Sequence, residues 1–392
     1  MVSAACLRMA TMDHKALRSQ SRLSDVHDGT PSVPNPTRLA LARKRRGYKK
    51  TKLAELSKVD LRAVSAFEAG EYPPSPETLT RIASALKFPV EFFYGDDLDE
   101  PSLDSGSFRS MSKMTAPQRD MALSQAALGL HFMEWIESRF ELPEASLPDL
   151  SREPNPEAAA ESLRRAWSLG ALSIRNMIHL LEAKGIRVLS LAVDAREVDA
   201  FSMWKGARPF VFLNTYKSTE HSRFDAAHEL GHLVLHKHGP PQGREAEKQA
   251  NTFASAFLMP RASVLANVPR FPSHSTLVRL KKVWTTSVSA LSYRLHELGV
   301  MSDWQYRGLC VEIAKRGRDK EPEEAPRETS LILPRTLAAL YEEGVTRAQI
   351  AQALCLPSAE LEQLLFGLAI TGIDGGRKQS PAQLPTSLKR VK

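Results

Sequence analysis

The sequence predicts a multidomain protein with an all-α N-terminal domain, an α+β body that contains a small sheet, and a small all-α C-terminal domain. Three observations predict this class. Apolar residues recur at helical spacing in short stretches over 36–95 and again over 331–370. Between them, at 186–213, the pattern changes to short runs of branched and aromatic residues, which are typical of strands. Segments 96–107 and 316–330 are charged and contain proline, so we expect them to be linkers.

Composition limits the classes to which this chain can belong. Its 392 residues fit two or three domains, and the net charge of +8 suggests an acidic partner if the basic residues cluster. The three cysteines, Cys6, Cys310 and Cys355, form no Cys-x-x-Cys pair, which argues against a disulfide scaffold or a cysteine zinc ribbon. No apolar run reaches the roughly 18 residues of a membrane span, and no signal-peptide pattern opens the chain. We therefore expect a cytoplasmic protein with residues 1–35 disordered.

Residues 36–95 predict four short helices. The first helix is indicated by an apolar stripe at Leu39, Leu41 and Ala42, and the second by the helical pattern over 50–56. Asp60 can cap a third helix that runs to Phe67, and Ser75-Pro76-Glu77 is a typical start for a fourth. Two short helices joined by a tight turn form a helix-turn-helix unit, whose second helix enters the major groove. Here that helix is the third of the segment. The pattern therefore predicts a partner in double-stranded DNA.

The basic residues cluster on the first two of these helices, at Arg43, Lys44, Arg45, Arg46, Lys49, Lys50 and Lys52. Phosphate contacts from such a cluster supply affinity that falls as salt rises. We expect Arg62 and Ser65 to contact bases, with Lys50 at the entry of the reading helix and Lys49 also on the DNA-binding face. One such unit covers a half-site, so a homodimer on a roughly palindromic operator is expected.

The segment from Pro36 to Tyr94 resembles the Xre/Cro repressor family. The matching residues are Leu53-Ala54, Val64-Ser65, Phe67-Glu68-Ala69-Gly70, Pro74-Ser75-Pro76 and Ile82-Ala83-Ser84-Ala85-Leu86. Two positions depart from the family pattern, because Lys50 replaces the usual glutamine at the start of the second helix and Lys58 replaces the glycine of the turn. A residue other than glycine in a left-handed turn costs roughly 1 to 2 kcal/mol.

The body, over 108–315, is expected to begin with helices and continue with strands. Helical spacing covers 121–140 and 158–183, strand candidates cover 186–191, 200–204 and 209–213, and closing helices cover 273–298. The strands would form a small sheet against the helix that follows them. An extended peptide could lie along an edge of such a sheet.

The helix expected over 222–236 contains His228-Glu229-Leu230-Gly231-His232. Two histidines four residues apart lie on one face of a helix, where both imidazoles reach a single ion, so the spacing is typical of a zinc site. The apolar neighbours predict a buried helix with the histidines at a core-facing cleft. Glu229 lies beside the first histidine, where it can hold the water that the metal activates and act as the catalytic base.

A catalytic zinc site uses three protein ligands and one open position, so a third ligand has to come from elsewhere. We favour Glu247, which shares one face of an expected helix over 245–254 with Asn251. Asn251 would accept a hydrogen bond from the far nitrogen of a ligating histidine. His236 is the rival third ligand, four residues after His232; the other interpretation is a helix C-terminal residue that interacts with the dipole.

These paired motifs, His-Glu-x-x-His and Glu-x-x-x-Asn followed by Phe-Ala-Ser-Ala-Phe-Leu-Met-Pro260, resemble the ImmA/IrrE family of metallopeptidases. The resemblance covers roughly Phe108 to Tyr306. It implies a zincin-like α+β body, Zn²⁺ as the cofactor, and a hydrolase that relieves transcriptional repression by cleaving a repressor protein. In that scheme His228, His232 and Glu247 hold the zinc.

The C-terminal helices expected over 331–370 loosely resemble a second helix-turn-helix unit, but pairs of this kind are more often packing or dimerisation units. Residues 371–392 are basic and poor in apolar residues, so we expect disorder.

The whole sequence predicts a DNA-binding transcription regulator with a zinc-dependent endopeptidase domain that cleaves a repressor or another regulatory protein. A flexible linker at 96–107 would bring that peptidase to proteins bound at the same DNA. The alternative is a non-catalytic Xre-type transcription factor whose metallopeptidase-like domain senses a ligand or metal.

Overall fold

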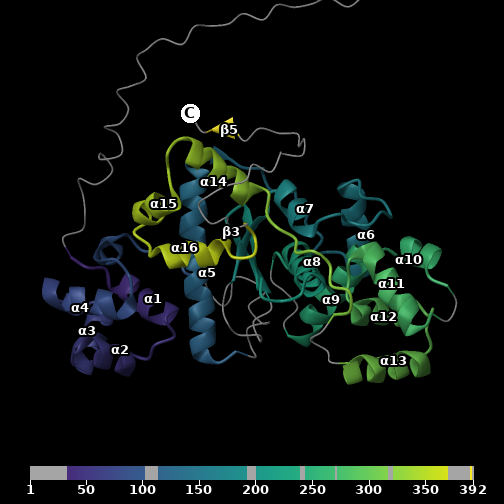
Figure 1. Cartoon of the computed structure of the whole chain (residues 1–392), viewed down its shortest axis with the longest axis horizontal. Helices are drawn as coiled ribbons and strands as arrows, with labels where there is room; N and C mark the ends of the chain where they lie inside the picture. The colour runs from purple at the N-terminus through teal and green to yellow at the C-terminus, as the bar shows by residue number, and fades with distance from the viewer. Residues whose placement is uncertain are drawn as a thin grey trace, which may run out of the picture.

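The computed structural model describes residues 33–101, 114–191, 200–238, 243–269, 272–316, 321–369 and 389–390. In these ranges the predicted class is confirmed: helices form the N-terminal and C-terminal parts, and a small sheet lies within a mainly helical body (Figure 1). The expected disorder of residues 1–32, and of most of 371–392, concerns residues outside the described ranges. Within that tail, β5 (Lys389–Arg390) is described, and it pairs antiparallel with β1 (Phe140–Glu141).

The N-terminal head consists of α1 (Pro36–Arg45), α2 (Lys50–Ser57), α3 (Leu61–Ala69), α4 (Pro76–Leu86) and the short 3-10 helix η2 (Val90–Tyr94). The Asp60 side chain caps α3 by accepting from the Arg62 amide, and Ser75 caps α4. Lys58, at the turn between α2 and α3, has a φ of 53° and lies in the left-handed region. The sequence therefore predicted this turn correctly.

The three predicted strands are present as β2 (Arg187–Ser190), β3 (Ala200–Lys205) and β4 (Arg208–Leu213), in the order β2-β4-β3. β2 runs parallel to β4, and β3 runs antiparallel to it. Leu189 and Phe212 are paired and face α5 (Ala116–Glu137), where a Cβ on Gly129 would lie only 2.9 Å from Leu189 Cδ1. Ser202 and Val211 form the neighbouring pair, on the other face, which packs on α8 (Thr219–Leu235). Helices therefore cover both faces of the sheet.

The expected helix over 158–183 is wrong in one respect, because two helices replace it: α6 (Pro156–Ala166) and α7 (Met177–Ala183). Ser168 and Gly170 both take positive φ, which ends α6. The buried Arg164 guanidinium donates to the carbonyls of Gly170 and Leu172 and so holds the connecting loop. Asn176 then caps the start of α7. Apolar spacing alone did not reveal this interruption.

The head is joined to the rest of the molecule by a buried ion pair as well as by the chain. Arg45 Nε lies 2.7 Å from Glu360 Oε2, and Arg46 Nη1 lies 2.5 Å from Glu360 Oε1. The Arg45 side chain is 4% exposed and that of Glu360 is 1% exposed. α1 also packs against α5. Arg45 and Arg46 therefore connect the head to α16 (Ser358–Leu365), in addition to the expected linker.

The described part of that expected linker, 96–101, is itself held in place. Asp97 accepts from the Thr37 hydroxyl at the start of the head, and Asp99 pairs with Lys205 at the end of β3. Residues 102–107 lie outside the described ranges. The domain boundaries proposed from the sequence stay predictions.

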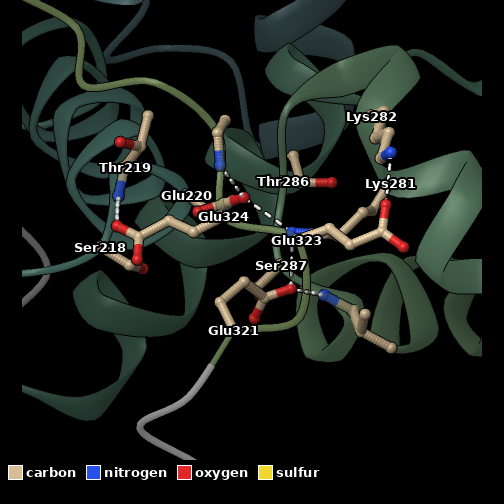
Figure 2. A network of polar contacts seen from close by, with 12 residues as sticks. Ser218, Thr219, Glu220, Lys281, Lys282, Thr286, Ser287, Glu321, Glu323 and Glu324 are labelled. Atoms are coloured by element: carbon tan, nitrogen blue, oxygen red, sulfur yellow. Dashed lines mark hydrogen bonds and ion pairs between the residues drawn. The ribbon is translucent and has the colours of Figure 1, made fainter.

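Residues 321–330, from the second expected linker, cross the body and bind it through carboxylates (Figure 2). Glu321 lies 3.1 Å from the Lys281 ammonium, which also lies 2.7 Å from Glu220, and all three side chains are buried. Glu324 accepts a hydrogen bond from the backbone amide of Thr219, the first residue of α8. The helix dipole is stabilised by negative charge at this end of a helix. This segment therefore stabilises the start of α8.

Two further groups of helices complete the fold. α10 (Arg261–Asn267), α11 (His274–Trp284), α12 (Val288–Glu297) and α13 (Asp303–Arg316) close the body, and α14 (Ile332–Glu342), α15 (Arg347–Ala353) and α16 (Ser358–Leu365) form the C-terminal part. α16 packs on β2 and α5, so the C-terminal helices serve as a packing unit between sheet and head. None of the helices in the described ranges combines the length and apolar character that crossing a membrane requires.

Candidate metal centre and DNA-binding face

The packing of α8 on α9 (Arg244–Leu258) brings the motif residues together. Gly231 makes this close approach possible, because a Cβ at this position would lie 3.0 Å from Phe253 Cδ1. His228 and His232 lie one turn apart on α8 and face Glu247 in the first turn of α9. Two helices that are separate in the sequence therefore supply three donor groups to one place.

The three side chains converge on one point. The Nε2 atoms of His228 and His232 are 3.0 Å apart, and each lies 3.5 Å from a carboxylate oxygen of Glu247. One ligand atom from each residue falls within 4.8 Å of the others. Glu247 Oε1 is buried and makes no hydrogen bond within the described part of the chain. Two imidazole nitrogens and a carboxylate oxygen fit a catalytic zinc site.

Each histidine is also held on its far side. His228 Nδ1 lies 3.0 Å from Asn251 Oδ1, the contact expected from the sequence. His232 Nδ1 lies 2.9 Å from His236 Nδ1, and His236 Nε2 lies 3.0 Å from Gln249 Oε1. His236 is the C-terminal cap residue of α8 and is not among the three converging groups.

Glu229 lies next to these histidines on α8 and is only 1% exposed. Ser202 of β3 donates a hydrogen bond of 2.7 Å to Glu229 Oε2. The buried strand therefore fixes the direction of the carboxylate that we expect to act as the base. The role of Ser202 was not predicted from the sequence.

The electrostatics of the site favour deprotonated ligands at two of the three positions. Burial lowers the pKa of His232 to about 4, so this imidazole is neutral. Burial acts to raise the pKa of Glu247, but the adjacent imidazoles of His228 and His232 outweigh this effect and hold the pKa well below its usual range. Burial likewise acts to lower the pKa of His228, but Glu247 and Glu229 outweigh it and raise that pKa to about 9. The negative charges around His228 attract a cation.

Comparison with known families assigns both parts of the chain. Residues 181–296 match the family model of the IrrE N-terminal-like domain, a peptidase family, and this range includes every residue of the centre described above. This part of the body is similar to the IrrE N-terminal-like domain. Residues 39–93 match the helix-turn-helix family model, which covers most of the head. No curated protein matched the chain in the corresponding search.

Of the expected DNA-binding residues, Arg62 and Ser65 lie on α3, Lys50 begins α2 and Lys49 is the N-cap of α2. Arg62 and Lys49 are exposed, and Ser65 is half-buried. Lys50 is 41% exposed and lies 3.5 Å from Glu68 Oε2. The structure therefore places exposed basic side chains at the start of both helices of the unit.

Most of the basic run on α1 has other partners. Arg43 pairs with Glu68 and Lys44 with Glu100, while Arg45 and Arg46 share Glu360. These four charges already have carboxylate partners in the described part of the chain, and the expected phosphate contacts stay a prediction. In the described part of the chain, no carboxylate pairs with Lys49 or Arg62, whereas Lys50 and Lys52 lie near Glu68 and Glu55.

Three contacts around this centre were not predicted from the sequence. Ser202 gave only the weak signal of a polar residue in an otherwise apolar strand. His236 ends α8, as one of the two interpretations had it, but the position of its ring behind His232 was not predicted. Gln249 carried no signal beyond its place two residues after Glu247.

Proposed function

We propose that this chain is a DNA-binding regulator whose IrrE N-terminal-like domain is a zinc-dependent endopeptidase. The observation that carries the proposal is the convergence of His228, His232 and Glu247 on one point. Glu229 follows His228 on α8, and its negative charge acts on that imidazole. The packing of a hydrophobic core does not need two imidazoles and two carboxylates, so packing alone does not explain their presence here. The helix-turn-helix domain supports a role at DNA.

The residues of the centre would divide the work of peptide hydrolysis. When bound, Zn²⁺ supplies a Lewis acid that polarises the scissile carbonyl and activates water. His228, His232 and Glu247 would hold the ion. Glu229 would take a proton from the attacking water and pass it to the leaving amine, with its carboxylate oriented by Ser202.

The shape of the sheet supports a protein substrate. β3 is an edge strand of the described sheet, and its residue Ser202 contacts Glu229. An extended peptide that pairs with such an edge would lie beside the proposed catalytic base. We therefore propose that the substrate is a repressor or another regulatory protein, cleaved in an extended segment.

Metal binding tests the ligand set. We expect the purified full-length protein to hold about one zinc per chain, and His228→Ala and Glu247→Ala to lose it, because catalytic sites use three protein ligands. Elemental analysis after dialysis measures the content. His238→Ala is the matched control, since His238 is exposed and pairs with Asp149 outside the centre. Full zinc occupancy in Glu247→Ala would contradict the assignment.

DNA binding tests the head. We expect the full-length protein to bind a selected operator as a dimer, with half-sites about one helical turn apart and an affinity that falls steeply with salt. Arg62→Ala should weaken operator binding by roughly 1 to 3 kcal/mol, as expected for a lost base contact. Fluorescence anisotropy on operator and on scrambled DNA measures both effects.

The control for that measurement is Lys44→Ala, which removes the same charge from a residue paired with Glu100. It should change operator affinity little. If both variants weaken operator and scrambled DNA equally, Arg62 reads no base.

A further inference from the structure

The back of His232 is occupied by an ordered chain of two side chains. His232 Nδ1 lies 2.9 Å from His236 Nδ1, and His236 Nε2 lies 3.0 Å from Gln249 Oε1. His236 stands at the end of α8, and Gln249 comes from α9, thirteen residues further along the chain. The chain of contacts therefore links both helices of the centre.

The donor and the acceptor of each hydrogen bond in this series can be assigned. Gln249 Nε2 donates to Glu245 Oε1 at 3.5 Å, and a carboxylate only accepts, so the amide oxygen of Gln249 points at His236. An amide oxygen also only accepts, so the proton of the His236 ring sits on Nε2. Nδ1 of that neutral ring is then an acceptor.

The same reasoning determines the tautomer of His232. Its Nδ1 faces an acceptor at His236 Nδ1 and must carry the ring proton. Its Nε2 is then left with a lone pair, and this atom faces His228 Nε2 and Glu247. A lone pair on Nε2 is the form that binds a metal ion.

We propose that His236 and Gln249 are positioning residues that hold His232 in its metal-binding tautomer and orientation; this inference rests on the proposed zinc site. Asn251 contacts the far nitrogen of His228 directly. α9 thus supports both histidines with an amide side chain, one directly and one through His236. This role differs from that of a third ligand, because the His236 ring faces the side of His232 away from the converging atoms.

The test is a Zn²⁺ titration of the full-length protein against a chromophoric chelator, with circular dichroism of each metal-free variant to establish folding. His236→Ala should weaken Zn²⁺ binding about 10- to 100-fold, the usual effect of losing a group that orients a ligand. Gln249→Leu should weaken it in the same direction, because the His236 ring loses its acceptor. Gln249→Glu keeps an acceptor oxygen at that position and should stay close to wild type.

Lys248→Ala, at an exposed position of the same helix, is the control and should leave the affinity unchanged. Affinity of folded His236→Ala or Gln249→Leu within about twofold of wild type would overturn the proposal. Complete loss of binding in His236→Ala, equal to that in His228→Ala, would make His236 a ligand and would also overturn it. A wild-type protein that binds no zinc would instead refute the proposed metal site itself, and with it this inference.

Discussion

Replacing Glu229 with glutamine is expected to abolish cleavage of the protein substrate and leave zinc bound. Glutamine has the size of glutamate and can still accept the hydrogen bond from Ser202, but it cannot take a proton from water. A positioned base contributes about 10²- to 10⁴-fold to such reactions, so turnover should fall by at least that range. Quantitative proteomics of cells that carry wild type or Glu229→Gln would identify the substrate and measure its loss together.

Two measurements accompany this experiment. Glu161→Gln makes the same chemical change at an exposed position of α6 and should cleave as wild type does. Zinc content and operator affinity of Glu229→Gln should match wild type, because the residue is neither an expected metal ligand nor part of the head. These controls separate a lost base from a lost fold.

The outcome also decides between the two functions considered. If wild type and Glu229→Gln give the same proteome and the same promoter output, the proposed peptidase activity is refuted. The protein would then be a transcription factor whose metallopeptidase-like domain senses a ligand or metal. Loss of both cleavage and derepression in Glu229→Gln supports the peptidase.

Replacing Glu360 with alanine is expected to destabilise the protein by roughly 3 to 5 kcal/mol, the usual cost of removing one partner from a buried ion pair. Arg45 would keep its charge in a buried position without the carboxylate that compensates it, and Arg46 would lose the same partner. The contact holds the head against α16, so the head should separate from the body in Glu360→Ala. Urea denaturation followed by circular dichroism measures the loss.

Glu362→Ala is the matched control on the same helix. Glu362 pairs with Arg347 at 3.2 Å, but both side chains are partly exposed, and pairs of that kind contribute about 0 to 1 kcal/mol. Equal destabilisation by the two substitutions would show that the Arg45–Glu360 pair has no special role. Glu360→Ala should also make the segment 96–101 more sensitive to limited proteolysis, a separate sign that the head has been released.

Much of the fold was predictable because its signals are local. The caps at Asp60 and Ser75, the left-handed Lys58 and the apolar runs of the strands each depend on a few neighbouring residues. The spacing of His228, His232 and Glu247 is also local, since each pattern lies within a single helix. The failures were different in kind: the break before α7 depends on Arg164, whose guanidinium binds carbonyls that no pattern of apolar residues records.

The strands, the helix-turn-helix unit and the set of candidate metal ligands could therefore be predicted from residue patterns. The contact of His236 with the back of His232 and the hydrogen bond from Ser202 to Glu229 could be found only in the folded structure. The same packing pairs Arg45 with Glu360, 315 residues away. Periodicity and capping act within one helix or strand, whereas the partner of a buried polar group is set only when distant segments pack and most such groups acquire a hydrogen bond.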